Sequence, residues 1–301
     1  MLHFGLCCLF SKEPIKITTY KKKNLQLLPI EEQKKKIKDV VYSNIENTQK
    51  AIDYCFRNNI QTYRVSSDIV PHFDYISTIL TKEEINDFWD KLKKIDTKGL
   101  ILSTHPGQFV NLGSPKESVI KSSLEELVYH KYIVDSLGFY EINIHLGGTY
   151  GNKEETKKRF IQTVENNEWL KDYLTIENDE LNFSIKDTLE VCNTLNIPCT
   201  YDLHHDNCNR LKETNEVEQV YYFEECKKTW LNKGYNFMRM HISSPREGYI
   251  SASKSRAHSD YIDKNDFPLW LLEKSRDFEI CLDIEAKKKE EAIFKLLEDL
   301  K

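Results

Sequence analysis

The sequence predicts one closed α/β barrel of eight parallel strands, the (β/α)8 or TIM barrel. Three observations favour this fold class: eight short apolar runs, helical periodicity between them, and polar residues at the ends of most runs. Strands that alternate with helices form a parallel sheet, and eight such units close into a barrel. An open doubly wound sheet would need a G-x-G-x-x-G turn or similar at its switch point, which the sequence lacks.

The eight expected strands are the short apolar runs that alternate with longer helical stretches. In chain order they are Leu2–Cys8, Thr62–Val65, Leu100–Ser103, Tyr140–His145, Leu174–Glu177, Cys199–Asp202, Phe237–His241 and Glu279–Glu285. The last helix is expected at Glu290–Leu300, whose apolar residues share one face.

The expected helices include Ile37–Cys55, where apolar residues recur at near-helical spacing. Thr81 and Glu84 predict a capping box, in which each residue's side chain bonds the other's backbone N–H. Ser114, followed by proline, predicts a helix start, and Gly138 predicts its end.

Composition indicates one folded domain spanning residues 1–301. The chain has 43 Lys and Arg against 48 Asp and Glu, hence a formal charge of −5, and it contains no repeat or Pro/Gly-rich linker. Without a basic tail, this acidic balance offers no overall electrostatic footprint for nucleic acid. No apolar run approaches the roughly 20 residues that cross a bilayer.

The protein is expected in the cytoplasm, or in the nucleus of a eukaryote, and not to be secreted. The apolar segment Met1–Phe10 lacks a basic start and a small-residue cleavage site, so a buried strand fits it better than a signal peptide. The eight cysteines form no C-x-x-C pair, which favours reduced thiols and argues against zinc-finger chemistry.

Imidazoles and carboxylates stand at or just beyond the ends of the expected strands. They are His105, His145, Glu177, Asp202, His205, His241, His258 and Glu285. In a barrel the carboxyl ends of all strands meet on one face, so these groups become neighbours. Burying so many ionisable groups without a counter-charge is prohibitive, and metal coordination is the usual resolution.

The donor types indicate which metals and which chemistry to expect. Mixed imidazole and carboxylate ligands without thiolate suit manganese, zinc, magnesium or iron. Eight ligands exceed what one ion needs, whereas two or three ions sharing bridging carboxylates would use them all. Two or more metals a few ångström apart are typical of phosphate-ester hydrolysis.

The same strand ends resemble the UV damage endonucleases. The shared motifs, in order, are STHPGQF (103–109), NIHLGGTYG (143–151), TIEND (175–179), the Asp-x-x-His of 202–205, HISSP (241–245), AHSD (257–260) and DIEAK (283–287). The match also includes FGLCCLF (4–10) and RVSSDIVP (64–71), so it covers essentially the whole chain. Each motif alone is weak, but seven in order at compatible spacings are specific.

The resemblance implies a TIM barrel like those of endonuclease IV and the xylose isomerases, with two to three divalent ions. Manganese is the metal usually described, with Mg2+, Zn2+ or Co2+ as alternatives. Carried over by position, the eight residues above are the implied metal ligands, and Glu177, His145, Glu285 and Arg239 form the implied catalytic group. His204 has the wrong offset from Asp202 for the family ligand and is expected to support its neighbours.

The implied reaction cuts damaged double-stranded DNA. It hydrolyses the phosphodiester immediately 5′ to pyrimidine dimers, 6-4 photoproducts and often abasic sites, and leaves a 3′-hydroxyl and a 5′-phosphate. The resemblance makes Gln108 and Phe109 a wedge that enters the duplex at the lesion. An inserted aromatic ring offsets lost stacking, and a distorted lesion is cheaper to extrude than an intact pair. We expect a monomer that needs no organic cofactor and no membrane.

Arg239 departs from the family pattern. Family members carry a lysine two residues before the histidine of the seventh strand, and in some it is carboxylated and touches the metals. A guanidinium cannot form that carbamate and stays positive. We therefore expect Arg239 to contact a phosphate or a carboxylate near the metals.

Two other classes of function stay open on the sequence alone. One is a metal-dependent sugar isomerase or aldolase on the same barrel, which should lack the Gln108–Phe109 wedge. The other is a damage-binding module whose metals are only structural. The acidic balance does not exclude binding of DNA or phosphate. Three divalent ions would change the formal net charge from −5 to about +1, and they would lie where a phosphate must bind.

Overall fold

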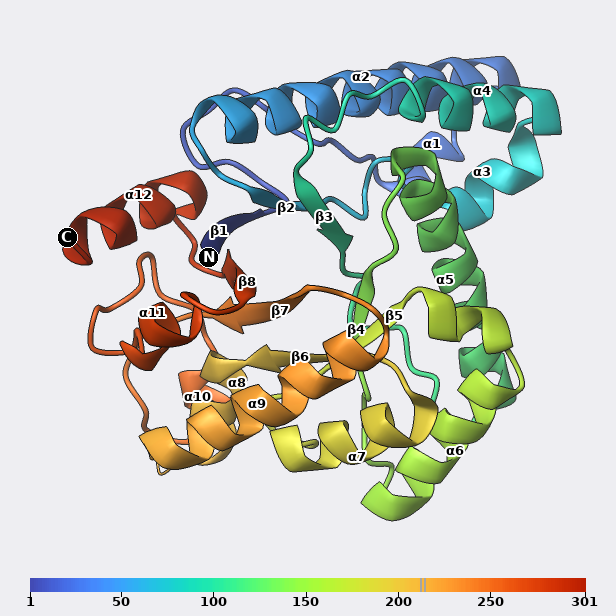
Figure 1. Cartoon of the computed structure of the whole chain (residues 1–301). Helices are drawn as coiled ribbons and strands as arrows, with labels where there is room; N and C mark the ends of the chain where they lie inside the picture. Colours follow the sequence, from blue (N-terminus) through green and yellow to red (C-terminus); the bar gives the residue numbers. More distant parts are fainter. Residues whose placement is uncertain (212, 214) are drawn as a thin grey trace.

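In the computed structural model, eight parallel strands close into a barrel, which confirms the predicted fold class (Figure 1). The structure describes residues 1–211, 213 and 215–301. Each strand pairs with the next along the chain, and β8 pairs with β1. The strands are β1 Leu2–Cys7, β2 Thr62–Val65, β3 Ile101–Thr104, β4 Ile142–His145, β5 Leu174–Glu177, β6 Cys199–Asp202, β7 Phe237–Ile242 and β8 Glu279–Ile284.

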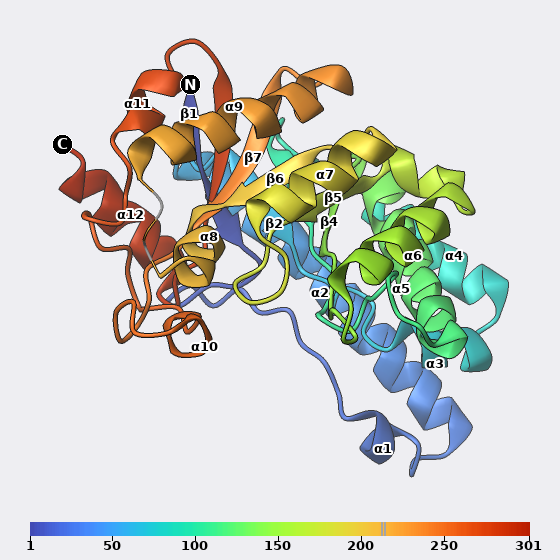
Figure 2. The same cartoon turned by 90° about the horizontal axis from the view of Figure 1, so that it is seen from below.

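Helices surround the strands in both views (Figures 1 and 2). They are α1 Lys22–Leu25, α2 Ile30–Arg57, α3 Phe73–Ile79, α4 Lys82–Leu92, α5 Glu117–Leu137, α6 Lys153–Glu165, α7 Ile185–Leu195, α8 Leu203–Asn209, α9 Glu216–Asn232, α10 Ala252–Ser255, α11 Trp270–Lys274 and α12 Lys289–Asp299, with a 3-10 turn at Glu168–Asp172. Among the described residues, no helix combines the length and the apolar character that a membrane span needs.

The predicted helix ends are largely confirmed. Thr81 and Glu84 form the expected capping box at the start of α4, and Gly138 ends α5 with a φ of 73°, a conformation that glycine adopts without strain. The predicted start at Ser114 is wrong by about one turn. The Ser114 hydroxyl accepts from the Lys116 N–H at 3.1 Å, forming a turn that precedes the first helical residue, Glu117.

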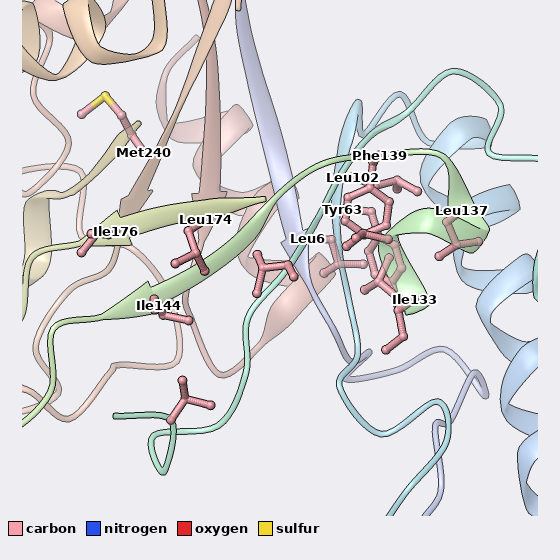
Figure 3. Close-up of a cluster of buried hydrophobic side chains, with 14 of the residues drawn as sticks. Leu6, Tyr63, Leu102, Ile133, Leu137, Phe139, Ile144, Leu174, Ile176 and Met240 are labelled. Carbon is pink, nitrogen blue, oxygen red and sulfur yellow. The ribbon is translucent and has the colours of Figure 1, made fainter. Parts of the chain in front are cut away.

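Apolar residues of the strands alternate with polar ones that point into the barrel. Figure 3 shows part of the apolar core, in which Tyr63 and Leu102 of β2 and β3 lie near Ile133 and Leu137 of α5. The intervening residues contact one another across the barrel, because Arg239 of β7 donates to Thr62 of β2 at 2.6 Å although these strands are not neighbours. The barrel interior is therefore polar and charged, unlike the branched apolar filling of most TIM barrels.

A glycine in β1 makes room for one of these inward charges. A Cβ built on Gly5 would lie 2.1 Å from Oδ1 of Asp283 and 2.8 Å from Cγ2 of Thr62. Asp283 is fully buried and its carboxylate bonds Arg239, so it has no free space to move into. Only a residue without a side chain fits at this position of β1.

Gly5→Ala should lower the free energy of unfolding by about 3 kcal/mol, because it disrupts a buried ion pair as well as the packing. Urea denaturation followed by circular dichroism measures this change. Gly107→Ala is the matched control, since a Cβ there meets nothing within 4 Å. Equal stability of the two variants would show that the interior tolerates displacement of Asp283.

Candidate metal centre and active site

The predicted ligands gather at the carboxyl ends of the strands, around a cavity of about 470 Å³. Its lining includes Arg64, His105, Gln108, His145, Glu177, Asp179, His205 and Glu285. These residues come from β2, β4 and β5 and from segments that follow β3, β5, β6 and β8. The face is the one on which (β/α)8 enzymes carry their active sites.

Glu177 lies at the centre of the cluster and is only 1% exposed. Its carboxylate oxygens are 3.3 Å from Nε2 of His105, 3.9 Å from Nε2 of His145, 3.1 Å from Nδ1 of His205 and 3.1 Å from Nδ1 of His241. Burial raises the pKa of Glu177, but the imidazoles of His241 and His145 outweigh it and the pKa lies well below its usual value. The carboxylate is therefore ionised at neutral pH.

Asp202 ends β6 and caps α8, and so fixes the place of His205. Its Oδ1 accepts from the His205 backbone N–H at 2.7 Å, while Oδ2 lies 3.7 Å from Nδ1 of His241. Oδ2 is buried and has no hydrogen-bond partner among the described residues, although Nδ1 of His205 lies 3.4 Å away. Burial raises the pKa of Asp202 to about 6. An acceptor left bare at this depth is typical of a ligand to a cation.

Two groups of three residues could each hold an ion: His105, His145 and Glu177, and Glu177, Asp202 and His241. Within each group the donor atoms lie within 4.8 Å of one another. Glu177 belongs to both, as a bridging carboxylate between two ions would. Within the described part of the chain, the buried Nδ1 of His145 also lacks a hydrogen-bond partner. The donor set of imidazoles and carboxylates fits hard or borderline divalent cations.

Glu285 and His258 extend the cluster toward the rim. Oε1 of Glu285 lies 3.5 Å from Nδ1 of His241, and Oε2 lies 3.8 Å from Nδ1 of His258. Burial raises the pKa of Glu285, but the guanidinium of Arg64 outweighs it and the pKa lies well below its usual value. The structure therefore brings all eight predicted ligands into one continuous cluster.

Backbone carbonyls orient three of the imidazoles, and one of these contacts joins Nδ1 of His258 to the carbonyl of Glu285 at 2.6 Å. Nδ1 of His105 is 2.9 Å from the carbonyl of Pro106, which directs Nε2 toward Glu177. Nδ1 of His205 lies 3.0 Å from the carbonyl of Asn178. Contacts of this kind fix the ring orientation of metal-binding histidines.

His204 is buried, and no contact between it and Glu177 is seen among the described residues. It packs edge-on against His258, with ring centroids 5.1 Å apart, and lies 3.7 Å from the sulfur of Cys208. Burial lowers the pKa of His204 to about 3. This place beside a predicted ligand agrees with the supporting role expected of it.

Arg239 does not line the cavity, although it contacts carboxylates as expected. The side chain is fully buried, and Nε donates to Glu141 at 2.7 Å while Nη1 donates to Asp283 at 2.9 Å. In the described part of the chain it makes no hydrogen bond or ion pair with any of the eight predicted ligands. Because it lies deeper in the barrel than the cavity, the geometry favours a positioning role over the catalytic role expected of it.

Sequence reasoning missed three polar residues that support the site. Arg64 lies 2.6 Å from Glu285 and 2.8 Å from His241, Asp283 lies 3.3 Å from Arg64, and Asn143 donates to Glu177. A signal existed, because Asn143 and Asp283 precede predicted ligands by two residues. Residues two apart on a strand point to the same face.

The loop after β3 carries the predicted lesion-contacting pair at the rim of the cavity. Gln108 lines the cavity. Phe109 is 86% exposed, the highest value among the large apolar side chains that the structure describes. Phe109 therefore does not pack beneath its own loop.

Comparisons with known proteins agree on one family. A family model described as UV-endonuclease UvdE matches residues 2–301. A UV DNA damage endonuclease of Bacillus velezensis is 33% identical over 304 residues, covering 97% of this chain and 91% of that protein. The crystal structure of SacUVDE superposes with a TM-score of 0.76 at 25% identity and covers 100% of this chain and 98% of that one.

A more distant likeness confirms the predicted kind of barrel. Endonuclease IV of Thermus thermophilus superposes with a TM-score of 0.58 at 14% identity, over 84% of this chain and 92% of that one, which shows the fold alone. The family model and the similar relative, by contrast, span almost the entire sequence. The chain belongs to the UV-endonuclease UvdE family.

Proposed function

We propose that this protein is a metal-dependent DNA repair endonuclease that nicks the phosphodiester immediately 5′ to UV photoproducts and leaves a 3′-hydroxyl and a 5′-phosphate. Its substrates are duplexes with pyrimidine dimers or 6-4 photoproducts, and duplexes with abasic sites. Family membership supports the general activity, that of a DNA repair endonuclease. The proposal of metal-dependent cutting beside a lesion rests on one arrangement of residues. Glu177 belongs to two ligand groups, and above them the rim of the cavity carries an exposed aromatic ring.

The eight clustered residues would hold two to three divalent ions, with Mn2+ as the first choice and Mg2+, Zn2+ or Co2+ as alternatives. The chemistry that such ions supply, when bound, is a nucleophile for in-line attack on phosphorus and neutralisation of the leaving oxygen. Glu177, held by the Asn143 amide, keeps its negative charge fixed between both groups. His145 and Glu285 line the same cavity, where a substrate phosphate would be in reach of them.

Lesion recognition is assigned to the loop after β3. Phe109 projects into solvent, where it can enter a duplex without first leaving a packed core. Gln108 lines the cavity and can bond the edge of an unpaired base. An aromatic ring that replaces lost stacking favours sites where the stack is already disturbed. The proposed enzyme acts as a cytoplasmic monomer without an organic cofactor.

A labelled duplex with a single thymine dimer tests the proposal. With Mn2+, the protein should produce one nick immediately 5′ to the dimer, with a 3′-hydroxyl that a polymerase extends, and chelator should abolish it. Denaturing electrophoresis locates the cut. Intact DNA under all metal conditions would contradict the proposal. Tight binding without cutting would favour the damage-binding module, and conversion of a sugar without DNA binding would favour the isomerase or aldolase.

Glu177→Gln should lower the nicking rate by at least about 10²- to 10³-fold, because a neutral amide cannot bridge two ions or stabilise developing charge in the same way. Binding of dimer-containing DNA should change much less. Single-turnover kinetics and fluorescence anisotropy measure the two effects. Glu180→Gln, which alters a cavity-lining carboxylate outside the ligand cluster, is the control. Equal rates for the two variants would remove Glu177 from the catalytic group.

Phe109→Ala should reduce the preference for damaged over undamaged duplex by about tenfold, since stacking of an aromatic ring on a base contributes about 1–3 kcal/mol. Competition binding with matched dimer-containing and undamaged duplexes measures this ratio. Phe56→Ala is the control, because Phe56 is also exposed but lies at the opposite end of the barrel, near the end of α2. An unchanged ratio in Phe109→Ala would exclude the wedge.

A further inference from the structure

Arg64 reaches from β2 into the metal-ligand cluster. Its Nη1 lies 2.6 Å from Oε1 of Glu285, and its Nη2 lies 2.8 Å from Nε2 of His241 and 3.3 Å from Oδ2 of Asp283. The residue is 8% exposed and lines the cavity. Two of its three partners are thus predicted metal ligands.

The cavity contains one permanent positive charge in the part of the chain that the structure describes. Among the cavity-lining residues Arg64 is the sole Lys or Arg, whereas Glu177, Asp179, Glu180 and Glu285 are acidic. A phosphodiester entering this cavity finds one guanidinium, which suits two phosphate oxygens in a bidentate contact.

Asp283 is the fixed partner of Arg64. It is fully buried, and its other oxygen, Oδ1, accepts from Nη1 of Arg239 at 2.9 Å. Arg239 is held in turn by Glu141 at 2.7 Å and by the hydroxyl of Thr62 at 2.6 Å. A chain of alternating charges therefore runs through the barrel interior and ends at Arg64.

The contact of Arg64 with His241 conflicts with metal binding. A guanidinium only donates hydrogen bonds, and Nη2 of Arg64 lies 2.8 Å from Nε2 and 3.4 Å from Nδ1 of His241. Nδ1 is the nitrogen 3.1 Å from Glu177 and 3.7 Å from Asp202, so it is the one that would bind an ion. A cation bound at Nδ1 would therefore lie close to the guanidinium of Arg64, and the two positive charges would repel each other.

We propose that Arg64 exchanges partners: without metal its guanidinium neutralises Glu285 and bonds His241, and with metal it keeps Asp283 and binds the substrate phosphate. The first half concerns the ligand cluster alone. The second half rests on the proposed endonuclease function. Asp283 acts as the pivot, since it contacts Arg64 in both states, and Arg239 positions Asp283.

Metal affinity tests the first half without DNA. Arg64→Gln should bind Mn2+ about tenfold more tightly in isothermal titration calorimetry, because a competing cation is gone, a change on the scale of other residues around metal ligands. The melting temperature of the chelator-treated variant should fall, since Glu285 and Asp283 lose their counter-charge. Arg210→Gln removes an arginine that pairs with Asp206 outside the cavity lining and should leave Mn2+ affinity unchanged.

If the glutamine variant does not fold, Arg64→Lys tests whether Arg64 competes with metal for its partners. It keeps the charge but cannot bridge Glu285 and His241 together, so Mn2+ affinity should rise about threefold. Unchanged or weaker Mn2+ affinity in the folded variants would overturn the exchange and leave Arg64 as a support for bound metal.

The phosphate contact is tested by salt dependence. In single-turnover nicking of the dimer duplex, the half-saturating protein concentration should rise in Arg64→Gln, and its logarithmic salt slope should fall by about 1, the value for one lost phosphate contact. An unchanged slope would overturn the contact. Absence of nicking by the wild-type protein would instead count against the proposed function, and the Mn2+ measurement would still decide the exchange.

Discussion

The arrangement of the barrel interior depends on the compensation of buried negative charge. Five carboxylates lie in or at the end of the interior, against two guanidiniums, Arg64 and Arg239; the carboxylates are Glu141, Glu177, Asp202, Asp283 and Glu285. Isolated charges at such depth are prohibitively costly. Imidazoles and divalent cations are the remaining sources of positive charge, and four imidazoles already surround Glu177.

This compensation divides the barrel interior into two levels. In the lower level Arg239 joins Glu141 to Asp283 with no access to the cavity, so the pairing is permanent. In the upper level Glu177 and Glu285 line a cavity of about 470 Å³, where we propose that ions and a phosphate bind. Arg64 connects the levels, since it touches Asp283 below and Glu285 above. The lower level thus holds the upper one in place.

The strands and the ligand cluster could be predicted from the sequence because both depend on local pattern. Short apolar runs determine the strands, and closure of the barrel brings together the residues that follow each run. His105 and Glu285 therefore line the same cavity although 180 positions separate them. Partners across the interior could not be predicted. Spacing by two residues tells which way Asp283 points, but only the closed geometry shows that it meets Arg64 and Arg239.

Because partners in space cannot be predicted from spacing, the expectations about Arg239 and Phe109 were incomplete. The sequence indicates that Arg239 needs an anion, but not that Glu141 and Asp283 supply it beneath the cavity. The sequence places Phe109 in a loop after a strand, but it does not show whether the ring is buried. The exposure of 86% answers the second point, and it agrees with the role in lesion recognition that we propose for the rim of the cavity.

The central claim is that the excess of carboxylates in the upper level is balanced by two to three divalent ions. Anomalous diffraction from crystals of the Mn2+-loaded protein tests it most directly, because it locates each ion and its ligands. The account predicts two to three peaks, with Glu177 bound to two of them and Asp202, His241 and Glu285 among the other ligands. A single ion, or ions bound away from Glu177, would contradict it.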